Sequence, residues 1–483
     1  MMNKKTKIVA TISDLNCEVD FIRSLFDEGM NVVRINSAHT TFEGASKVVA
    51  NVRQVSDSIA ILIDTKGPEI RVTEVQAGGM KVAQGDKIEL CGCDGNSCIS
   101  TPGQDGVHKL FVNDKNINSN VPVGSLILID DGEIELKVVE CCGQTLLCQV
   151  SNCGVIKSHK SVNVPGVNIE LPSLTPKDIE YIHWAVDNDL DFIAHSFVRT
   201  KEDLIDIQSI LDARGSHIKI ISKIENQQGV DNIDEILDHC YGIMVARGDL
   251  GVELPAEQIP VTQRALVRKC IESKKPVIIA TQMLHSMIGS PRPTRAEVSD
   301  IANAIYQRVD AIMLSGETAS GQYPVEAVRT MATVAARIEE EVKPIEDINM
   351  VRINNEITAQ LSRSAVRAST NLPIKAIIVD TLTGRTARYL AAFRGSKPVY
   401  SLCYRKHVMR ELALSYGVCA EYGEPLIAHD RFTYQMLIRL ERSGTLAPTD
   451  LVIVIGGSFG AARGASYMEI SKVIHLINKA LID

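Results

Sequence analysis

The sequence predicts an α/β protein: a (β/α)8 TIM barrel with an inserted small β-barrel lid domain and a C-terminal open α/β domain. Strand-like and helix-like segments alternate from residue 7 to about residue 343, short β-rich runs interrupt them over residues 70–160, and a second alternating region follows residue 346. We therefore expect the barrel at residues 1–66 and 161–345, the lid at residues 67–160 and a regulatory domain at residues 346–483.

The first barrel segments form a βαβαβ pattern. Apolar runs typical of buried strands occur at residues 7–13, 31–37 and 60–64, and amphipathic helical stretches lie between them at residues 19–28 and 42–56. Such alternation is typical of a parallel sheet.

This alternation of strand-like and helix-like segments stops at Lys66-Gly67-Pro68. Short β-rich runs at residues 87–90, 125–129 and 134–139 are separated by turn signals such as Asp94-Gly95-Asn96. Because no long helical periodicity occurs there, we expect a small β domain inserted in the barrel.

The alternation resumes at Thr175-Pro176, an N-cap threonine followed by a first-turn proline. A capping box of Thr294 and Glu297 opens a later helix. With the first three strands, the runs at residues 191–196, 219–225, 242–246, 276–281 and 311–314 give the eight strands of a closed barrel. The last region has a helix at residues 353–370 and strands at residues 375–380, 398–403, 418–422 and 451–455.

The composition is that of a soluble multidomain protein, with 483 residues, 45% of them hydrophobic and 23% charged. A net charge of −8 argues against general binding to nucleic acid. No stretch approaches the roughly 20 apolar residues of a membrane span, and the apolar run after the basic N-terminus is broken too early for a signal peptide. We expect a cytoplasmic protein that binds neither nucleic acid nor membrane.

Seven of the twelve cysteines lie in one segment, at positions 91, 93, 98, 141, 142, 148 and 153. We expect reduced thiols packed as small apolar residues. A metal site is the alternative, but paired CxxC spacing is absent and His159 is the nearest histidine after the cluster.

Polar side chains end nearly every expected barrel strand, where the active site of such a barrel lies. They are Arg34 and Asn36, Asp64 and Lys66, Ser196, Lys223 and Glu225, Arg247 and Asp249, Thr281 and Gln282, and Ser315 and Glu317. A single charged side chain at the end of a strand usually belongs to the solvated rim of a barrel. Polar side chains from nearly every strand that converge on one mouth instead indicate a ligand-binding site.

The end of the fifth strand indicates the chemistry. Lys223 and Glu225 are two residues apart and project to one side of the strand, and Asp249 after the next strand supplies a second carboxylate. Two carboxylates without histidine suit Mg²⁺ better than zinc. For a phosphoryl donor and a nucleotide, the compensating cations would be Arg34, Arg71, Lys223 and Arg247 with the metal.

Seven motifs in order give the chain a resemblance to the pyruvate kinase family over essentially its whole length. They are Arg34-Ile-Asn36, the segment from Leu62 to Arg71, Ile221-Ser-Lys-Ile-Glu-Asn226, Met244-Val-Ala-Arg-Gly-Asp-Leu-Gly251, Ala280-Thr-Gln-Met-Leu284, the segment from Pro291 to Asp300, and Met313-Leu-Ser-Gly-Glu-Thr318. The resemblance implies phosphoryl transfer from phosphoenolpyruvate to ADP in the last step of glycolysis, followed by protonation of the enolate to pyruvate.

The resemblance also implies roles for individual residues. Lys223 would stabilise the transferring phosphoryl group, while Glu225 and Asp249 hold Mg²⁺. The substrate carboxylate would contact Arg247, Gly248 and Thr281, and the proton path would pass Thr281 and Ser315. Arg34 and Arg71 would contact the phosphates. The nucleotide-binding residues would be Asn36, His39, Arg71 and Lys160.

A potassium site is implied at Asn36, Asp64 and Thr65, with Glu69 as the acidic residue that accompanies potassium dependence. Ala38 departs from the family, because many members have a serine ligand there. We expect dependence on K⁺ to be retained with weaker affinity.

An effector site is expected between a strand and a helix of the last domain, where hydroxyls and free amides favour phosphate. Its residues, Thr381, Thr383, Gly384, Arg385 and Thr386, resemble the loop that grips a sugar phosphate in regulated family members. The loop from Gly456 to Gly464, which would cover such a ligand, does not follow the usual family pattern. Both a sugar phosphate and a nucleotide therefore remain as candidates for the allosteric effector.

Two other functions remain as alternatives. A mutase or an aldolase of the same barrel class would also pair Mg²⁺ with carboxylates, and strict dependence on ADP would distinguish them. A catalytically inactive scaffold would be expected to have lost Lys223, Glu225, Asp249 or Thr281, and all four are present. The family is usually a homotetramer, which we expect here.

Overall fold

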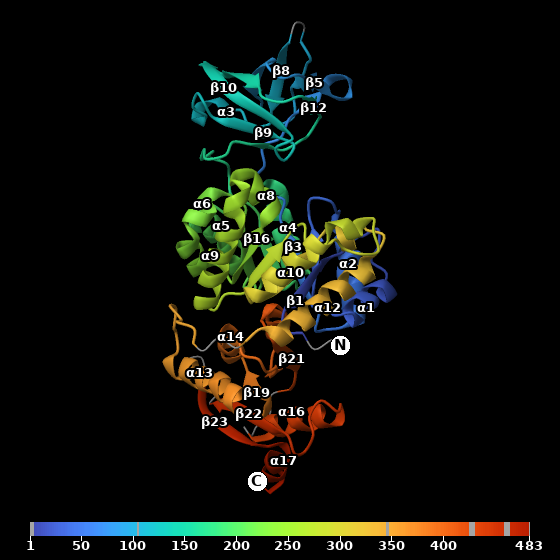
Figure 1. Cartoon of the computed structure of the whole chain (residues 1–483), viewed down its shortest axis with the longest axis vertical. Coiled ribbons are helices and arrows are strands. Elements are labelled where there is room, and N and C mark those ends of the chain that lie inside the picture. The colour runs from blue at the N-terminus through green and yellow to red at the C-terminus, as the bar shows by residue number, and fades with distance from the viewer. Residues whose placement is uncertain (1–3, 104–105, 344–346, 425–429, 458–463, 483) are drawn as a thin grey trace.

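The computed structural model of the chain describes residues 4–103, 106–343, 347–424, 430–457 and 464–482. Three bodies are stacked along the longest axis: the barrel lies in the middle, the β-rich insert at one end and the C-terminal α/β unit at the other (Figure 1). The barrel therefore has one end toward the insert and the opposite end against the C-terminal unit.

Eight parallel strands close the barrel, as the alternating pattern predicts. They are β1 (Lys7–Thr11), β2 (Val32–Asn36), β3 (Ala60–Asp64), β14 (Phe192–His195), β15 (Lys219–Ile224), β16 (Gly242–Ala246), β17 (Val277–Ala280) and β18 (Ala311–Leu314). β3 pairs directly with β14, with Leu62 opposite Phe192, so the ring closes although the whole insert lies between these strands in sequence. Nearly all of these strand residues are buried, because their side chains face either the barrel interior or the surrounding helices.

Helices surround this ring. They are α1 (Val19–Asp27), α2 (Phe42–Val55), α4 (Pro176–Asp187), α5 (Lys201–Ala213), α6 (Gln227–Asp231), α7 (Ile233–His239), α8 (Arg247–Glu253), α9 (Ile259–Glu272), α10 (Arg295–Tyr306), α11 (Gly316–Ala319) and α12 (Pro324–Glu341). The predicted N-caps are confirmed: Thr175 and Asp178 form a capping box at α4, and Thr294 and Glu297 form one at α10. None of the described helices is long and apolar enough to cross a bilayer.

The insert has its own apolar core. Its elements are β4 (Glu74–Val75), β5 (Met80–Val82), β6 (Lys87–Gly92), β7 (Ile99–Ser100), β8 (Val107–Val112), α3 (Ile117–Asn120), β9 (Leu126–Ile129), β10 (Ile134–Cys142), β11 (Thr145–Val150), β12 (Gly154–Ile156) and β13 (Val162–Asn163). In the inserted β domain, the described strands form a six-stranded sheet, in the order β13-β9-β10-β11-β6-β8, and two two-stranded sheets.

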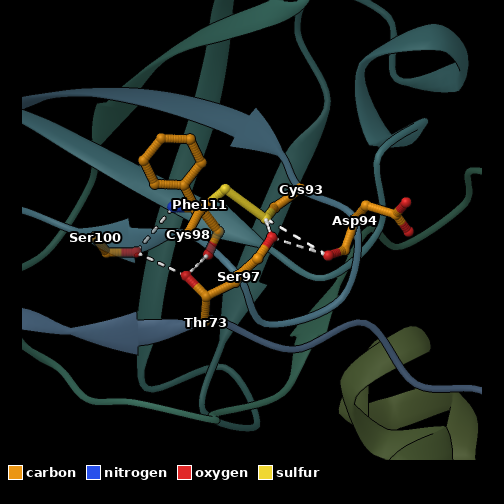
Figure 2. Close-up of a disulfide and its surroundings, with 7 residues drawn as sticks. All are labelled: Thr73, Cys93, Asp94, Ser97, Cys98, Ser100 and Phe111. Atoms are coloured by element: carbon orange, nitrogen blue, oxygen red, sulfur yellow. Dashed lines mark hydrogen bonds between the residues drawn. A yellow bond between two sulfur atoms is a disulfide. The ribbon is translucent and has the colours of Figure 1, made fainter.

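A disulfide joins Cys93 to Cys98 in this insert (Figure 2). The chain reverses between β6 and β7 and brings the two Cα atoms to 6.3 Å, within the usual range for a disulfide. The expectation of reduced thiols is therefore wrong for this pair. Among the other five cysteines of the segment, only Cys148 is buried as a small apolar residue; Cys91 is half-buried, and Cys141, Cys142 and Cys153 are exposed.

The C-terminal unit is a five-stranded sheet with helices, in the order β21-β20-β19-β22-β23. Its elements are α13 (Glu356–Asn371), β19 (Ile374–Thr381), α14 (Arg385–Ala392), β20 (Val399–Cys403), α15 (Lys406–Glu411), β21 (Val418–Tyr422), α16 (Asp430–Arg442), β22 (Leu451–Gly457), β23 (Ala465–Lys472) and α17 (Val473–Ile482). The predicted parallel strands are confirmed. The antiparallel edge strand β23 was not predicted, because five of its eight residues have polar or small side chains and it lacks a continuous apolar run.

A buried ion pair connects the barrel to the C-terminal unit. Both guanidinium Nη atoms of Arg394 donate to the carboxylate of Asp310, at 2.8 and 2.5 Å, and both side chains are under 5% exposed. The backbone amides of Val277 and Tyr416 also donate to Asp310. One carboxylate thus holds groups from both bodies.

Candidate active site

Lys223, at the carboxyl end of β15, contacts three oxygen atoms at the mouth of the barrel. Its Nζ lies 2.7 Å from the Ser196 hydroxyl and 3.0 Å from both Asp64 Oδ1 and Glu225 Oε1. Burial disfavours the charged ammonium group, but Asp64 and Glu225 outweigh this effect and raise the pKa of Lys223. A fixed positive charge is therefore held at the mouth.

Arg34 is the second buried cation. Its Nε donates to Asp64 Oδ2 at 2.7 Å, and its Nη1 donates to the Thr11 hydroxyl at 3.0 Å. Although burial opposes ionisation of Asp64, Arg34 and Lys223 together lower the pKa of this carboxyl. Asp64 therefore stays ionised and orients both cations.

Glu225 and Asp249 are the carboxylates predicted to hold a divalent cation. Glu225 is 1% exposed, and burial, with the nearby charge of Asp249, raises its pKa to about 7 despite the attraction of Lys223. Burial also raises the pKa of Asp249. Two carboxylates whose charged form is destabilised by burial are a suitable donor set for a hard cation.

This pair supplies only part of a coordination shell. The described ranges contain no group of three or more His, Cys, Asp or Glu side chains placed to hold a metal ion. A cation at Glu225 and Asp249 would therefore need oxygen ligands from substrate or water, as Mg²⁺ commonly has at phosphoryl-transfer sites.

A second group of predicted residues forms where β16 and β17 end. The Gly248 amide donates to the Thr281 hydroxyl at 2.9 Å, and this hydroxyl donates to the Ala280 carbonyl at 2.7 Å. Thr281 and Gln282 both have positive φ, at 69° and 57°. A positive φ is energetically costly for a β-branched residue such as Thr281, and backbone strain of this kind is typical of functional sites. This turn places Gly248 and Thr281 side by side.

Arg247, by contrast, is engaged within the protein. Its guanidinium group donates to the Thr281 carbonyl and to Asp300 Oδ1, both at 2.7 Å. It thus braces the turn that carries Thr281.

Two residues predicted at the phosphates or nucleotide lie at the base of the insert. Arg71 Nη2 is 2.6 Å from Glu69 Oε2 and its Nη1 donates to the His159 carbonyl, while Lys160 Nζ is 2.8 Å from Asp130 Oδ1. In this arrangement both cations pair with acidic residues of the connecting segments and the insert. They are not in the Lys223 cluster.

The expected potassium ligands are close together but already hydrogen-bonded. Asn36 Oδ1 accepts from the Ala38 amide at 3.1 Å, and the Thr65 carbonyl accepts from the Ser196 hydroxyl at 2.7 Å. Both Asp64 oxygens are engaged with Lys223 and Arg34. A monovalent cation would have to share these oxygens.

The remaining predicted residues lie around these groups. His39 is exposed beyond β2, and the Ser315 amide donates to Glu317 at the start of α11. In the C-terminal unit, the Gly384 amide donates to the Thr381 hydroxyl at 2.9 Å, which forms the turn before α14 and carries Thr383, Arg385 and Thr386. Residues 458–463 of the other effector loop lie outside the described residues.

Sequence reasoning missed two groups at the mouth. Ser196 was noted as a strand end, but not as the hydroxyl that contacts Lys223. The Phe197 amide donates to Glu225 Oε2 at 2.6 Å from a backbone with φ of 55°. A backbone donor leaves no signal in side-chain chemistry, so no pattern could have indicated Phe197.

Comparisons with known proteins agree with this geometry. Residues 3–328 match the pyruvate kinase barrel domain, and residues 359–471 match the pyruvate kinase alpha/beta domain. Pyruvate kinase of Borreliella burgdorferi is 46% identical over 478 residues, which is 98% of each chain. Pyruvate kinase of Geobacillus stearothermophilus is 40% identical over 488 residues, covering 99% of this chain and 82% of that one.

A solved structure supports the same assignment. The crystal structure of a pyruvate kinase from Cryptosporidium parvum superposes with a TM-score of 0.90 and 32% sequence identity, covering 98% of this chain and 96% of the other. Since the domain matches, the full-length relatives and the fold agree, this chain belongs to the pyruvate kinase family.

Proposed function

We propose that this chain transfers the phosphoryl group of phosphoenolpyruvate to ADP, giving pyruvate and ATP, with Lys223 as the fixed cation at the transferring group. Membership of the family makes the chain a phosphotransferase of glycolysis. The observation that carries the residue-level proposal is the Lys223 ammonium group, whose side chain is 12% exposed and is held by Ser196, Asp64 and Glu225. A cation fixed before substrate arrives stabilises developing charge without reorganisation.

The charge balance of the mouth supports a divalent metal. Three carboxylates, of Asp64, Glu225 and Asp249, stand against two cations, Arg34 and Lys223. Mg²⁺ held by Glu225 and Asp249 would reverse this balance and help neutralise a polyanionic substrate. Lys223 and Arg34 would then bind and orient the phosphoryl group.

We assign the substrate carboxylate to the Gly248 turn. The Gly248 amide and the Thr281 hydroxyl lie side by side there, and both are donors that a substrate carboxylate would take over from their bonds within the protein. Arg247 would act by bracing the turn through the Thr281 carbonyl and Asp300. After phosphoryl transfer, the enolate would be protonated through Thr281 and Ser315, with water as the final donor.

Closure of the insert would bring the nucleotide contacts into place. Arg71 and Lys160 lie at its base, so its movement toward the barrel would carry their charges toward a nucleotide that also contacts Asn36 and His39.

We retain a K⁺ site at Asn36, Asp64 and Thr65, an effector loop at residues 381–386, a homotetramer and a cytoplasmic location as proposals. We also retain the domain limits 1–66 and 161–345, 67–160 and 346–483.

A stoichiometric assay tests this function. Phosphorus NMR of purified protein with phosphoenolpyruvate, ADP, Mg²⁺ and K⁺ should show loss of phosphoenolpyruvate and ADP in equal amounts with formation of ATP. Omitting ADP should abolish the loss of phosphoenolpyruvate. Consumption of phosphoenolpyruvate without ADP would instead favour a mutase or an aldolase, and no consumption by folded protein would favour a scaffold.

A further inference from the structure

The Cys93–Cys98 disulfide closes an exposed turn between β6 and β7 of the insert (Figure 2). Cys93 directly follows β6 and Cys98 directly precedes β7, and all of residues 94–97 between them are exposed. Cys93 is only 4% exposed, whereas Cys98 is half-buried. The Cys98 half of the disulfide is therefore the more accessible to a reductant in solution.

The other ten cysteines of the chain are free thiols, and four of them, at positions 141, 142, 153 and 419, are exposed. Exposed thiols that stay free are typical of proteins in a reducing compartment, which agrees with the proposed cytoplasmic location. Disulfides in such a compartment are usually transient, and they are catalytic or redox-sensing. The one disulfide among these twelve cysteines is therefore a candidate for a redox-sensitive group.

Hydrogen bonds connect the disulfide turn to Thr73, on the segment that enters the insert from the barrel. Ser100 Oγ, two residues beyond Cys98, accepts from the Phe111 amide at 2.9 Å and lies 3.3 Å from Thr73 Oγ1. The Thr73 amide donates to the Phe111 carbonyl at 2.9 Å. Figure 2 shows these side chains beside the disulfide. Because β7 is only two residues long, the adjacent disulfide helps to fix the position of Ser100.

Arg71 lies two residues before Thr73 on the same segment. Its backbone amide donates to Asn113 Oδ1 at 2.7 Å, and its carbonyl accepts from the Asn113 amide at 3.0 Å. The preceding residue, Val112, accepts from the Cys93 amide at 2.8 Å. Both ends of the disulfide are thus connected by hydrogen bonds to the backbone that carries Arg71.

From this arrangement we propose that Cys93–Cys98 is a site of thiol–disulfide exchange with a dithiol reductant, and that its reduction loosens the segment carrying Arg71 and weakens nucleotide binding. A thiolate of the reductant attacks the Cys98 sulfur, and the Cys93 sulfur leaves as a thiolate. The second thiol of the reductant then displaces Cys98. The reductant becomes a disulfide, and the two cysteines gain two electrons and two protons.

Ser97 stands where it can assist the first step. Its Oγ lies 3.2 Å from Cys93 Sγ, so its hydroxyl can donate to the leaving thiolate. Once the turn is open, the chain between the two cysteines regains conformational freedom, and β7 loses a covalent restraint. The effect on nucleotide binding rests on the proposed function of Arg71, whereas the loosening of its segment does not.

Hydrogen exchange of the full chain, measured by mass spectrometry with and without dithiothreitol, tests the loosening. Alkylation and peptide mapping of the same samples report the oxidation state of Cys93 and Cys98. Exchange in the peptides that contain Thr73 and Asn113 should rise roughly tenfold on reduction, because opening the short disulfide loop restores chain entropy. Oxidised dithiothreitol should restore the initial rates.

Steady-state formation of pyruvate in the same two states tests the consequence for the nucleotide. The KM for ADP should rise roughly three- to tenfold on reduction, since part of a charge-assisted contact of Arg71 is lost. The double variant Cys93→Ser/Cys98→Ser should give the values of the reduced form with or without dithiothreitol. The control Cys153→Ser removes an exposed thiol of the same insert and should respond as the parent does.

The proposal fails if the native protein keeps the Cys93–Cys98 disulfide in dithiothreitol, or if exchange near Thr73 is the same in both states. An equal KM for ADP in the two states, with exchange changed, would overturn the connection to the nucleotide. If neither state forms pyruvate, the proposed function has failed, and the exchange rates alone then decide whether the disulfide holds this segment.

Discussion

Magnesium should stabilise the folded chain through Glu225 and Asp249, and this stabilisation should be lost in Glu225→Gln. Burial raises the pKa of both carboxyls in the metal-free protein, and repulsion from Asp249 raises that of Glu225 further. A bound divalent cation removes that repulsion, and because the two carboxylates are brought together only by folding, it binds the folded chain in preference to the unfolded one.

The magnitude follows from linkage. At a Mg²⁺ concentration 100 times its Kd, binding to the folded state alone adds about 2.7 kcal/mol to the free energy of unfolding. For a domain of 150–250 residues, the melting temperature changes by at least roughly 2 °C for each kcal/mol of added stability. The midpoint of thermal unfolding should therefore rise by about 5 °C. In Glu225→Gln the amide oxygen can still accept from the Phe197 amide, so the metal-free fold should be retained.

Differential scanning fluorimetry with increasing MgCl₂ measures this effect. The control is Glu170→Gln, which removes an exposed carboxylate and should keep the full response of the parent. An equal Mg²⁺ response in the Glu225→Gln variant and the parent, or no response in the parent, would refute the assignment of Glu225 as a ligand.

Three further substitutions separate catalysis from stability. Ser196→Ala removes one of three Lys223 contacts, and since a hydrogen bond to a charged group contributes about 1.5–3 kcal/mol, kcat should fall roughly ten- to a hundredfold; an unchanged kcat in steady-state assays would contradict this role. Gly248→Ala should raise the KM for phosphoenolpyruvate without lowering the melting temperature, because the new Cβ meets Thr281 only at 3.6 Å; unchanged kinetics would remove Gly248 from the site. Arg394→Met leaves Asp310 buried without its partner and should cost about 3–5 kcal/mol in denaturant unfolding, whereas Arg337→Met, at an exposed pair, should cost little; equal losses would refute the account of this contact.

Much of the barrel and its site could be predicted because both depend on local patterns. Apolar runs ending in Arg34, Asp64, Lys223 or Thr281 identify strand and mouth together, since the carboxyl ends of parallel strands meet at one end of a barrel. The caps at Thr175 and Thr294 were predictable because the side chain that caps the helix is adjacent to it in sequence.

The rest depends on contacts distant in sequence. Asp310 and Arg394 are 84 residues apart, so nothing near either residue indicates their pairing. The contact of Arg71 Nη1 with the His159 carbonyl spans 88 residues and depends on the path of the whole insert. The Cys93–Cys98 disulfide is an exception, because its cysteines are close in sequence and only the path of one turn decides whether they meet. The contact between Ser196 and Lys223 required the register of β14 against β15, in which His195 lies opposite Ser222.

The most direct test of the central claim is the turnover of Lys223→Met, measured beside its affinity for phosphoenolpyruvate and its circular dichroism. If Lys223 stabilises the transferring phosphoryl group, kcat should fall roughly 10² to 10³-fold, the scale for loss of one preorganised electrostatic donor, in protein that remains folded. Folded Lys223→Met protein that forms pyruvate at the parent rate would contradict the account.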